Sequence, residues 1–522
     1  MPYADGVTPS ETSKYEKRGI AVKVPKWIPE NCIGCNKCAL VCPHAAIRPF
    51  LLNAEEEAAK PAAFVTKEAK GKGFEGLTFR MQVDPLDCQG CGACANVCPA
   101  KEKALKRAPI DSQRDQEAVF EYGINLPAKE EVAAKFKETT VKGSQFKQPL
   151  LEFSGACGGC GETPYAKLAT QLFGDKMFIA NATGCSSIWG GSAPATPYTV
   201  NKAGHGPAWE NSLFEDNAEF GLGMALAQNA VRGRLAELTE KLIAVEYATA
   251  EIKEAGQKWL DTMADRAAND QPAKDYIAAL EAGVIEGCKC EACALASQIL
   301  KDKDYLAKKS MWILGGDGWA YDIGFGGLDH ALASGEDINV LVFDTEVYSN
   351  TGGQASKSTP CGSVAQFAAT GKATKKKDLA AIAMSYGYVY VAQVAMGADM
   401  NQCIKAFNEA ESYHGPSIIL AYAPCINHGI KGGMGVSQVE EKKAVAAGYW
   451  HNFRFDPRRA DNGENPFQLD SKAPTASYRD FIMGEVRYNS LTRSFPERAE
   501  KLFANAEKYA VEKYEKLKKM AE

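Results

Sequence analysis

One cysteine spacing occurs twice near the start of this 522-residue chain, and it constrains the fold more than any other feature. The stretches "CIGCNKCALVCP", from Cys32, and "CQGCGACANVCP", from Cys88, both follow the pattern C-x2-C-x2-C-x3-C-P. Four thiolates at this spacing can enclose a cubane iron–sulfur cluster. Ligation by sulfur alone in two identical frames suits such clusters better than zinc. We therefore expect two [4Fe–4S] clusters near the N-terminus.

The repeat also predicts which cysteines share a cluster. In bacterial two-cluster ferredoxins, the fourth cysteine of each run binds the other cluster. We expect one cluster on Cys32, Cys35, Cys38 and Cys98, and the other on Cys42, Cys88, Cys91 and Cys94. This crossing would join both runs into one compact unit. Between the runs, residues 49–87 are interpreted as an insertion, with a short helix at "NAEEEAAK" and a strand at "GLTFRMQVDP".

Composition excludes several classes of function. The net charge is only −5, from 60 basic and 65 acidic residues, so no nucleic-acid partner is expected. The most apolar runs, "INVLVF" and "SIILAYA", are too short to span a bilayer, and the N-terminus has no apolar signal region. Seventeen cysteines in such a chain favour metal or redox chemistry over disulfides. We expect a cytoplasmic protein without a membrane partner.

Residues after 150 alternate between apolar runs and helical segments. The runs "KMFIANATGC", "SMWILGGDG", "INVLVFDTEV", "GYVYVAQV" and "SIILAYAPC" are typical of buried strands, with helical stretches such as "AEFGLGMALAQNAVRGRLAELTEKLIAVEYA" between them. This pattern predicts a doubly wound α/β domain. We divide the chain into a two-cluster ferredoxin-like α+β domain at 1–115, a connector at 116–150, the α/β domain at 151–435 and a helical C-terminal extension at 436–522.

A second group of cysteines has less specific spacing. In "SGACGGCGETPYAK", Cys157 and Cys160 are equally compatible with a redox dithiol, half of a zinc site or half of a cluster site. Cys185 and Cys425 each follow an apolar strand-like run, where the loops of a doubly wound sheet converge. The four cysteines could therefore meet. The alternative is that Cys185 and Cys425 are small buried apolar side chains.

Two loops about thirty residues apart favour a diphosphate and a metal ion. "GGDGWAYDIGFGG" ends a strand in Gly-Asp-Gly, which lets the backbone approach a diphosphate while Asp317 offers an oxygen ligand to Mg2+. The second loop, "DTEVYSNTGGQ", would bring Thr345, the Val347 carbonyl and Asn350 to the same ion and diphosphate. Alone, Gly-Asp-Gly is as often an ordinary turn. Only together with the second loop does the Gly-Asp-Gly sequence indicate a cofactor site.

These loops resemble the thiamine-diphosphate-binding half of the pyruvate:ferredoxin oxidoreductases. The similarity runs from "GDGWAYDIGFGGLDH" through "DTEVYSNTGGQASKSTP" and includes "CGGCGETPYAKL", "NATGCSSIWGGSAPATPYTVN" and "GPAWENSLFEDNAEFG". It implies a third [4Fe–4S] cluster on Cys157, Cys160, Cys185 and Cys425, with Mg2+ on Asp317, Thr345 and Val347. It also implies that thiamine diphosphate is lined by Glu162, Cys185, Gly316, Asp317, Gly318, Trp319, Thr345, Glu346, Val347, Tyr348, Ser349 and Asn350. Asn350 would act near the substrate. Thr345 stands where many thiamine enzymes have Asn, which the family tolerates.

The resemblance implies oxidative decarboxylation of a 2-oxoacid, most closely pyruvate, to acyl-CoA and carbon dioxide. Electrons would pass through three clusters to ferredoxin or flavodoxin. In single-chain members of the family, further domains precede this part, whereas here Met1 opens almost directly onto the repeat. We therefore expect a natural subunit, rather than a truncated chain, in a hetero-oligomer whose second chain carries the pyrimidine-side and coenzyme-A-binding domains. The alternative is a non-catalytic iron–sulfur electron-transfer subunit, but the intact Asp317, Thr345 and Asn350 favour catalysis.

Two further features are not included in this function. In "GCKCEACAL", Cys288, Cys290 and Cys293 have C-x-C-x2-C spacing without an apparent fourth ligand, so exposed or regulatory thiols are favoured over a metal site. The run "KATKKKD" at 372–378 is interpreted as a solvated charge run, with docking of an acidic ferredoxin as the alternative.

Overall fold

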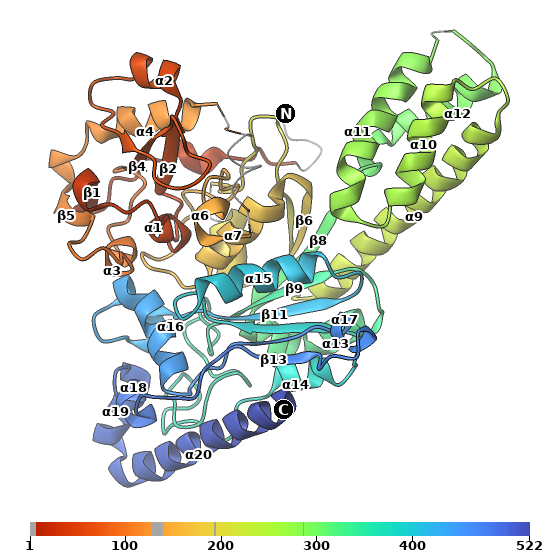
Figure 1. Cartoon of the computed structure of the whole chain (residues 1–522). Coiled ribbons are helices and arrows are strands. Elements are labelled where there is room, and N and C mark those ends of the chain that lie inside the picture. The colour runs from red at the N-terminus through yellow and green to blue at the C-terminus, as the bar shows by residue number, and fades with distance from the viewer. Residues whose placement is uncertain (1–6, 128, 130–136, 138, 193–194, 286) are drawn as a thin grey trace.

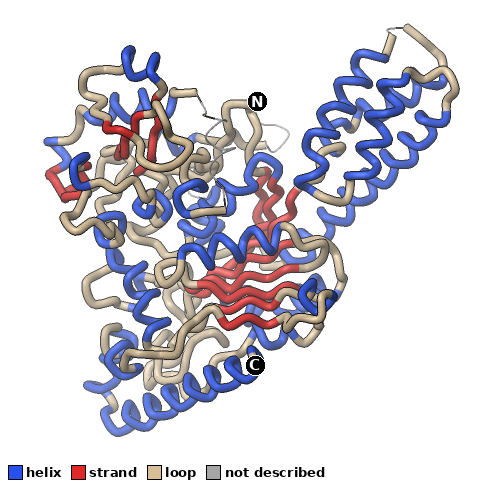
Figure 2. The backbone as a smooth tube through the Cα atoms, in the orientation of Figure 1, coloured by secondary structure: helices blue, strands red, loops and turns tan. Residues whose placement is uncertain are grey.

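The molecule has three parts, of which the helical arm stands apart in outline (Figure 1). The computed structural model describes the whole chain except residues 1–6, 128, 130–136, 138, 193–194 and 286. An N-terminal part, residues 7–127, lies against a central α/β domain, and an arm of long helices projects from the far side of that domain (Figures 1 and 2). The predicted site residues lie in the first two parts.

The N-terminal part is built around the two cysteine runs. β1 (Lys23–Trp27) pairs antiparallel with β5 (Leu105–Pro109), and β2 (Ile47–Leu52), β4 (Thr78–Val83) and β3 (Lys67–Glu68) form a second antiparallel sheet in that order. Each cysteine run contains a short helix, α1 (Lys37–Leu40) or α3 (Ala93–Asn96). The remaining helices of this region are α2 (Ala54–Ala59), α4 (Gln116–Asn125) and α6 (Val141–Ser144). α2 and β4 occupy the stretches predicted as helix and strand within the insertion.

The central domain is a twisted sheet with mostly parallel strands. Among the described residues its order is β13-β12-β10-β11-β9-β8-β6-β7, and the strands from β10 to β7 are parallel to one another. These strands are β6 (Met177–Ala182), β7 (Ala208–Ser212), β8 (Ser310–Gly316), β9 (Asn339–Asp344), β10 (Tyr390–Val394) and β11 (Ser417–Tyr422). Each of the five apolar runs forms one of them. The predicted doubly wound α/β fold is confirmed.

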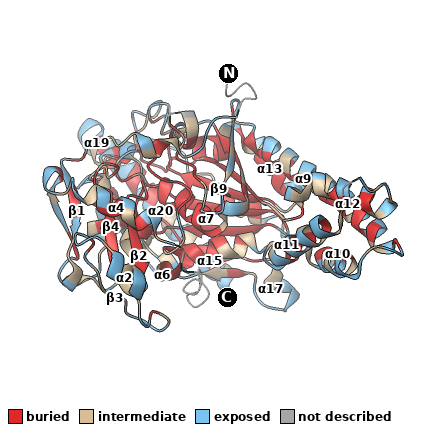
Figure 3. Ribbon diagram, turned by 90° about the horizontal axis from the view of Figure 1, so that it is seen from above, coloured by how far each residue is buried: buried red, intermediate tan, exposed pale blue. Residues whose placement is uncertain are grey.

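Helices cover both faces of this sheet, so its strands are buried (Figure 3). Successive residues of a strand point to opposite faces. In β9, Leu341 packs with α7 (Thr163–Phe173) and α15 (Met400–Glu411) on one face. Val340 packs with the start of α9 (Asn217–Ala244), α13 (Phe325–Ala333) and α14 (Leu379–Met384) on the other face.

The C-terminal segment contributes to the sheet as well as to the helical layer. Its helices are α16 (Ser437–Ala446), α17 (Arg458–Asp461), α18 (Tyr478–Ile482), α19 (Val486–Ser494) and α20 (Pro496–Ala521). β12 (Phe453–Phe455) and β13 (Phe467–Leu469) add two antiparallel strands beyond β10. The segment predicted to be helical therefore also closes one edge of the central sheet.

The arm is formed by the chain between β7 and β8. It consists of most of α9 together with α10 (Ala250–Thr262), α11 (Arg266–Gly283) and α12 (Glu291–Lys301). These helices share a core of their own that includes Leu235, Trp259, Tyr276 and Ile299. No helix in the described part of the chain is long and apolar enough to cross a membrane.

Candidate cofactor site and iron–sulfur centres

The predicted site residues gather at one edge of the central sheet. β6, β8, β9 and β11 are neighbours in the parallel order, so their carboxyl ends lie together. Immediately beyond them come the loops that contain Cys185, Asp317, Thr345 and Cys425. The strand order therefore brings together loops that are up to 240 residues apart in the sequence, since 425 − 185 = 240.

Three oxygen atoms at the ends of β8 and β9 have the spacing that a small divalent cation requires. Thr345 Oγ1 lies 2.9 Å from Asp317 Oδ1 and 3.0 Å from the Val347 carbonyl oxygen. Neighbouring oxygen ligands of octahedral Mg2+ are about 2.9 Å apart, because each Mg–O bond is about 2.0–2.1 Å. All three residues are buried. Their hard oxygen donors therefore fit the predicted Mg2+ site.

Asp317 occupies an environment that disfavours its negative charge. Burial first, and then the nearby Asp344, raises the pKa of Asp317 to about 8. The Ser356 hydroxyl donates a hydrogen bond to Asp317 Oδ2 at 2.6 Å. A bound cation would favour the ionised form of Asp317 and offset its repulsion with Asp344. The sequence did not single out Ser356, which lies in the "QASKSTP" stretch of the second loop.

A buried ion-pair network holds the second loop in place. Glu346 stands between two of the oxygen donors with a φ of 61°, a left-handed conformation that is uncommon for a residue with a side chain. Its carboxylate pairs with Lys376 at 2.9 Å and with Arg487 at 2.8 Å. Although burial by itself raises it, these two cations bring the pKa of Glu346 down to about 2. The charged network therefore keeps the loop backbone fixed beside the oxygen donors.

The lysine run at 372–378 belongs to this network, which corrects its interpretation as a solvated charge run. Lys376 pairs with Asp344 and Glu346, and the Lys372 ammonium donates to the carbonyl oxygens of Ser356 and Thr359 at 2.6 and 2.7 Å. These partners lie at the end of β9 and in the second loop with its continuation. Lys372 and Lys376 are drawn inward, whereas Lys375 is exposed, because buried carboxylates and carbonyl groups need compensating donors.

Glycines make room where the two loops meet. A Cβ atom at Gly318 would lie 2.4 Å from the ring of Tyr348, whereas one at Gly316 would have the Phe343 carbonyl oxygen, 4.0 Å away, as its nearest neighbour. The Tyr348 hydroxyl donates to the Gly318 carbonyl at 3.2 Å, and Trp319 is buried beneath the loop. A cavity of about 700 Å3 borders this contact, lined by residues that include Tyr348, Ser356, Lys357, Lys372 and Lys377. Its basic lining suits a phosphate-bearing ligand.

Four further cysteines, Cys157, Cys160, Cys185 and Cys425, lie in loops at this edge of the sheet. The pKa of Cys185 is raised first by burial and then by Glu162, with further contributions from Cys160 and Cys425. The pKa of Cys425 is raised to about 11, first by burial and then by Glu162 and Cys157. Cys185 thus lies near Cys160 and Cys425, and Cys425 near Cys157, in a site where only Cys157 is exposed. Four cysteines brought together in this way are compatible with iron–sulfur ligation.

Close packing explains how the Cys157–Cys160 loop reaches Cys425. A Cβ atom at Gly161 would lie 2.6 Å from the backbone nitrogen of Pro424, so only glycine lets the two segments approach this closely. Asn427 Nδ2 donates to Cys425 Sγ at 3.6 Å and to the Ser349 carbonyl at 3.3 Å. The cysteine loops are thereby joined to the second cofactor loop.

Asn350 and Glu162 lie beside this thiol group. Asn350 Oδ1 is 4.0 Å from Cys185 Sγ, and the Ser349 hydroxyl is 3.2 Å from the same sulfur. Glu162 is buried, and the Trp189 indole donates to its carboxylate at 2.8 Å. Burial raises the pKa of Glu162 to about 7. A carboxyl group with such a pKa can hold or release a proton near neutral pH.

The cysteines of the two ferredoxin runs approach one another across the repeat. The pKa of Cys38 is raised well above its usual range, first by burial and then by three nearby thiols, those of Cys35, Cys32 and Cys98. The pKa of Cys94 is raised in the same way by burial and by the thiols of Cys91, Cys42, Cys88 and Cys38. Cys98 thus lies with the first run and Cys42 with the second. The influence of Cys38 on Cys94 indicates that the two groups are neighbours.

The second run lies closest to the thiol group of the central domain. A Cβ atom at Gly158 would lie 3.7 Å from the Cβ atom of Cys91. Asn96 Nδ2 donates to the Gly435 carbonyl at 2.7 Å, which joins α3 to the turn at Met434–Val436. The Cys88 run therefore lies next to both of the other cysteine groups.

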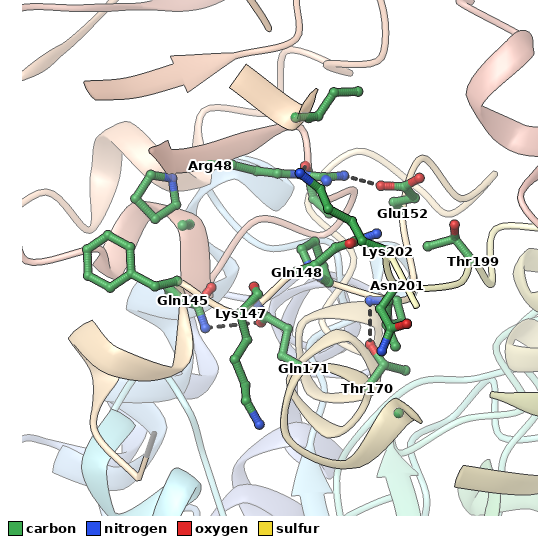
Figure 4. A pocket seen from close by; sticks show the side chains of 18 of the residues that line it. Arg48, Gln145, Lys147, Gln148, Glu152, Thr170, Gln171, Thr199, Asn201 and Lys202 are labelled. Carbon is green, nitrogen blue, oxygen red and sulfur yellow. Dashed lines mark hydrogen bonds and ion pairs between the residues drawn. The ribbon is translucent and has the colours of Figure 1, made fainter. Parts of the chain in front are cut away.

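A larger cavity of about 930 Å3 lies between the N-terminal part and the central domain, away from these centres (Figure 4). Arg48 and Glu152 form an ion pair on one side, and Gln145 Nε2 donates to Gln171 Oε1 at 3.1 Å on another. The residues that line the cavity include none of the predicted cofactor or cluster residues. The cavity is thus distinct from the site at the strand ends.

Known protein families match both regions. A model described as "4Fe-4S dicluster domain" matches residues 30–101, and "Thiamine pyrophosphate enzyme, C-terminal TPP binding domain" matches residues 289–421. The chain is 61% identical to the pyruvate:ferredoxin oxidoreductase of Moorella thermoacetica, over 99% of this chain and 44% of that protein. The chain is similar to one part of the pyruvate:ferredoxin and pyruvate-flavodoxin oxidoreductases.

Other relatives show the same partial coverage. A pyruvate-flavodoxin oxidoreductase of Klebsiella pneumoniae is 55% identical over 99% of this chain and 43% of its own length. A mitochondrial pyruvate dehydrogenase [NADP(+)] of Euglena gracilis is 49% identical over 99% of this chain and 28% of its own length. The chain therefore spans less than half the length of these curated relatives. The expected resemblance to this family is confirmed for the residues of this chain.

Proposed function

We propose that this chain is the thiamine-diphosphate-binding and cluster-binding portion of a 2-oxoacid:ferredoxin or flavodoxin oxidoreductase. The reaction is the oxidative decarboxylation of a 2-oxoacid, most closely pyruvate, to acyl-CoA and carbon dioxide. The observation that carries the proposal is the meeting of a buried oxygen triad (Asp317, Thr345 and the Val347 carbonyl) with four cysteines at one edge of the sheet. The names of the relatives support the same reaction.

Each group of residues has a role in this proposal. Asp317, Thr345 and the Val347 carbonyl hold Mg2+, which binds the cofactor diphosphate. Thiamine diphosphate, when bound, supplies the electron sink at the 2-oxo carbon. Asn350 is exposed next to Cys185 and orients the substrate by hydrogen bonding. Glu162 is the buried acid that exchanges a proton near neutral pH.

The cysteine groups provide a route for electrons out of the site. Cys157, Cys160, Cys185 and Cys425 hold the cluster beside the cofactor. The contact between Gly158 and Cys91 supports the second run as the next position, followed by the first run. Beside Cys32, Ile33 is 58% exposed and offers an apolar contact for an external carrier. A ferredoxin or flavodoxin therefore accepts electrons at this end.

The remaining contacts to cofactor and substrate come from elsewhere. The pyrimidine side of the cofactor and coenzyme A are held by a second chain or by the part of the protein that the relatives have in addition. Isolated chain then binds Mg2+-thiamine diphosphate weakly, because only one side of the cofactor is held. A cytoplasmic, hetero-oligomeric enzyme is consistent with this arrangement.

An anaerobic assay with and without the complementary part tests the proposal. We expect pyruvate- and coenzyme-A-dependent reduction of a ferredoxin or viologen dye only when both parts are present, and loss of this activity in Asp317→Asn. Full activity from the isolated chain would contradict the divided site. A reconstituted complex with complete clusters but neither cofactor binding nor turnover would favour the alternative, a non-catalytic electron-transfer subunit.

A further inference from the structure

Three cysteines that have no part in the proposed reaction meet at the end of the arm. Cys288, Cys290 and Cys293 lie between the end of α11 and the first turns of α12, at the tip farthest from the central sheet (Figure 1). Their three sulfur atoms all lie within 4.8 Å of one another. Among the described residues, no other group of three histidine, cysteine or acidic side chains is this compact. The sequence spacing alone did not reveal this convergence.

The local backbone is folded to support these sulfurs. The Cys290 N–H points to Cys288 Sγ at 3.5 Å, and the Cys293 N–H donates to Cys290 Sγ at 3.4 Å. The second bond makes Cys290 the N-cap of α12. Gly287, with a φ of 78°, turns the chain just before the first of the three. Backbone N–H groups that donate to sulfur stabilise a thiolate, which is the form that binds metals.

The three thiols differ in exposure in a way that suits a bound ion. Cys293 is buried against the arm, while Cys288 and Cys290 are half-buried. Two sulfurs therefore remain accessible to an entering ion, and one is anchored in the helix.

We propose that Cys288, Cys290 and Cys293 bind one zinc ion, with a water molecule as the fourth ligand. Zn2+ prefers tetrahedral sulfur ligation with Zn–S bonds of about 2.3 Å, which puts the sulfurs about 3.8 Å apart. Because all three sulfur separations are within 4.8 Å, reaching that spacing needs a contraction of at most about 1 Å. Within the described residues no fourth protein ligand lies in the group, which argues against a cubane cluster. Binding releases the remaining thiol protons to solvent.

The ion would fix the described turn from Cys288 to Cys293, which leads into α12. The arm has a small core of its own, centred on residues such as Trp259 and Tyr276. A metal that joins the turn at Cys288 to the first turn of α12 at Cys293 adds its binding free energy to the folding of this unit. Zinc therefore stabilises the arm without taking part in the reaction at the sheet edge.

Metal analysis of the full chain tests the site. The chain is purified anaerobically, incubated with ZnCl2, desalted, and analysed for zinc and iron. The variants are Cys288→Ser/Cys290→Ser/Cys293→Ser and the control Cys361→Ser, which replaces a buried cysteine elsewhere. We expect one zinc per chain in the wild type and the control, and none in the triple variant, with iron unchanged in all three.

X-ray absorption at the zinc edge provides a second measurement. We expect three sulfur neighbours and one oxygen neighbour in the wild type, and faster hydrogen exchange in α11 and α12 once zinc is removed by a chelator. Equal zinc in the wild type and the triple variant would overturn the proposal, as would a wild-type chain that does not retain zinc. Recovery of two of the three thiols as a disulfide in the anaerobic chain would also overturn it.

Discussion

At the scale of single residues, Thr345 is the residue on which the cofactor site most depends. Its hydroxyl is the one atom within hydrogen-bond distance of both other oxygen donors. Replacement by valine keeps the shape and removes this oxygen. We expect Thr345→Val to weaken binding of Mg2+-thiamine diphosphate by at least about tenfold, because losing one hydrogen bond to a charged group costs about 1.5–3 kcal/mol. Titration calorimetry on the purified chain measures this change.

The matched control for that change is Thr345→Ser, which retains the hydroxyl group. We expect its affinity to stay within about threefold of the wild type, because the oxygen donor remains. Equal loss of affinity in the valine and serine variants would mean that the hydroxyl group alone does not account for binding at this position.

A second residue-scale prediction concerns a buried histidine remote from the cofactor. His451 is buried against Tyr514 of α20, and burial, followed by Lys513, lowers its pKa to about 3. The unfolded chain has a histidine pKa of about 6.5, so acid protonates the unfolded state first. The contribution of neutral His451 to the free energy of unfolding is fully present above the unfolded-state pKa of about 6.5, and it is lost as the pH falls below that pKa. The loss is about 1.4 kcal/mol between about pH 7.5 and pH 5.5.

We expect His451→Phe to flatten the dependence of the melting temperature on pH over this range. The phenyl ring retains packing against Tyr514 and cannot be protonated. Anaerobic thermal unfolding at several pH values measures the slope, and His330→Gln, at an exposed histidine, serves as the control. Identical slopes for His451→Phe and the wild type would show that this histidine is not the group being protonated.

The sequence predicted some residues of the cofactor site and not others, and the difference has a physical reason. Asp317 and Thr345 directly follow apolar runs, and the ends of parallel strands share one edge of a sheet. Ser356 contacts Asp317 from a position 39 residues later in the chain. Arg487 contacts Glu346 from a position 141 residues later. Long-range contacts of this kind leave no periodic signal in a single sequence.

At the scale of secondary structure elements, the strands were predictable and the arm was not. Buried parallel strands produce short, continuous apolar runs that can be recognised locally. α9 has apolar residues at helical spacing throughout, and the sequence therefore predicted a helix between strands. Only its first turns, with Ala218 and Leu222, pack on the sheet, whereas Leu235 and Leu242 pack within the arm. Local periodicity predicts an apolar face but not its partner.

The separate core of the arm leads to an element-scale prediction. Trp259 is fully buried there, stacks on Tyr276 with ring centroids 6.0 Å apart, and donates to the Leu306 carbonyl at 2.8 Å. We expect Trp259→Ala to destabilise the arm by about 3–5 kcal/mol through the cavity that it creates. Hydrogen exchange should accelerate in α10, α11 and α12 while exchange in the central sheet and the iron content stay unchanged. Equal acceleration in the sheet would mean that the two cores unfold together.

The control for the arm is Tyr247→Ala, at a side chain that is 62% exposed between α9 and α10. A surface substitution of this kind should change stability by less than about 0.5 kcal/mol. The comparison separates the effect of the buried ring from a general sensitivity of the arm to substitution.

At the scale of the whole molecule, the N-terminal part and the central domain share one core. Leu40 and Val41, from the first cysteine run, pack in the same cluster as Tyr165 and Leu168 of α7. His44 Nε2 lies 2.9 Å from the Ala156 carbonyl oxygen, directly before Cys157. This shared packing holds the neighbouring cysteine groups in place. It is a consequence of the tertiary fold, which the spacing of each motif could not reveal.

The last prediction concerns the number of clusters that this arrangement holds. If the two ferredoxin groups and the central-domain group each hold a [4Fe–4S] cluster, anaerobically prepared chain should contain about twelve irons. Cys185→Ser should lower this to about eight, because the ferredoxin groups have their own crosswise cysteines and do not use Cys185. The control Cys403→Ser, in the apolar core of α15, should retain about twelve. Iron analysis with electron paramagnetic resonance of the reduced chain distinguishes these cases. Loss of all cluster signals in Cys185→Ser would mean that the three groups do not assemble independently, and about eight irons in the wild type would eliminate the cluster beside the cofactor.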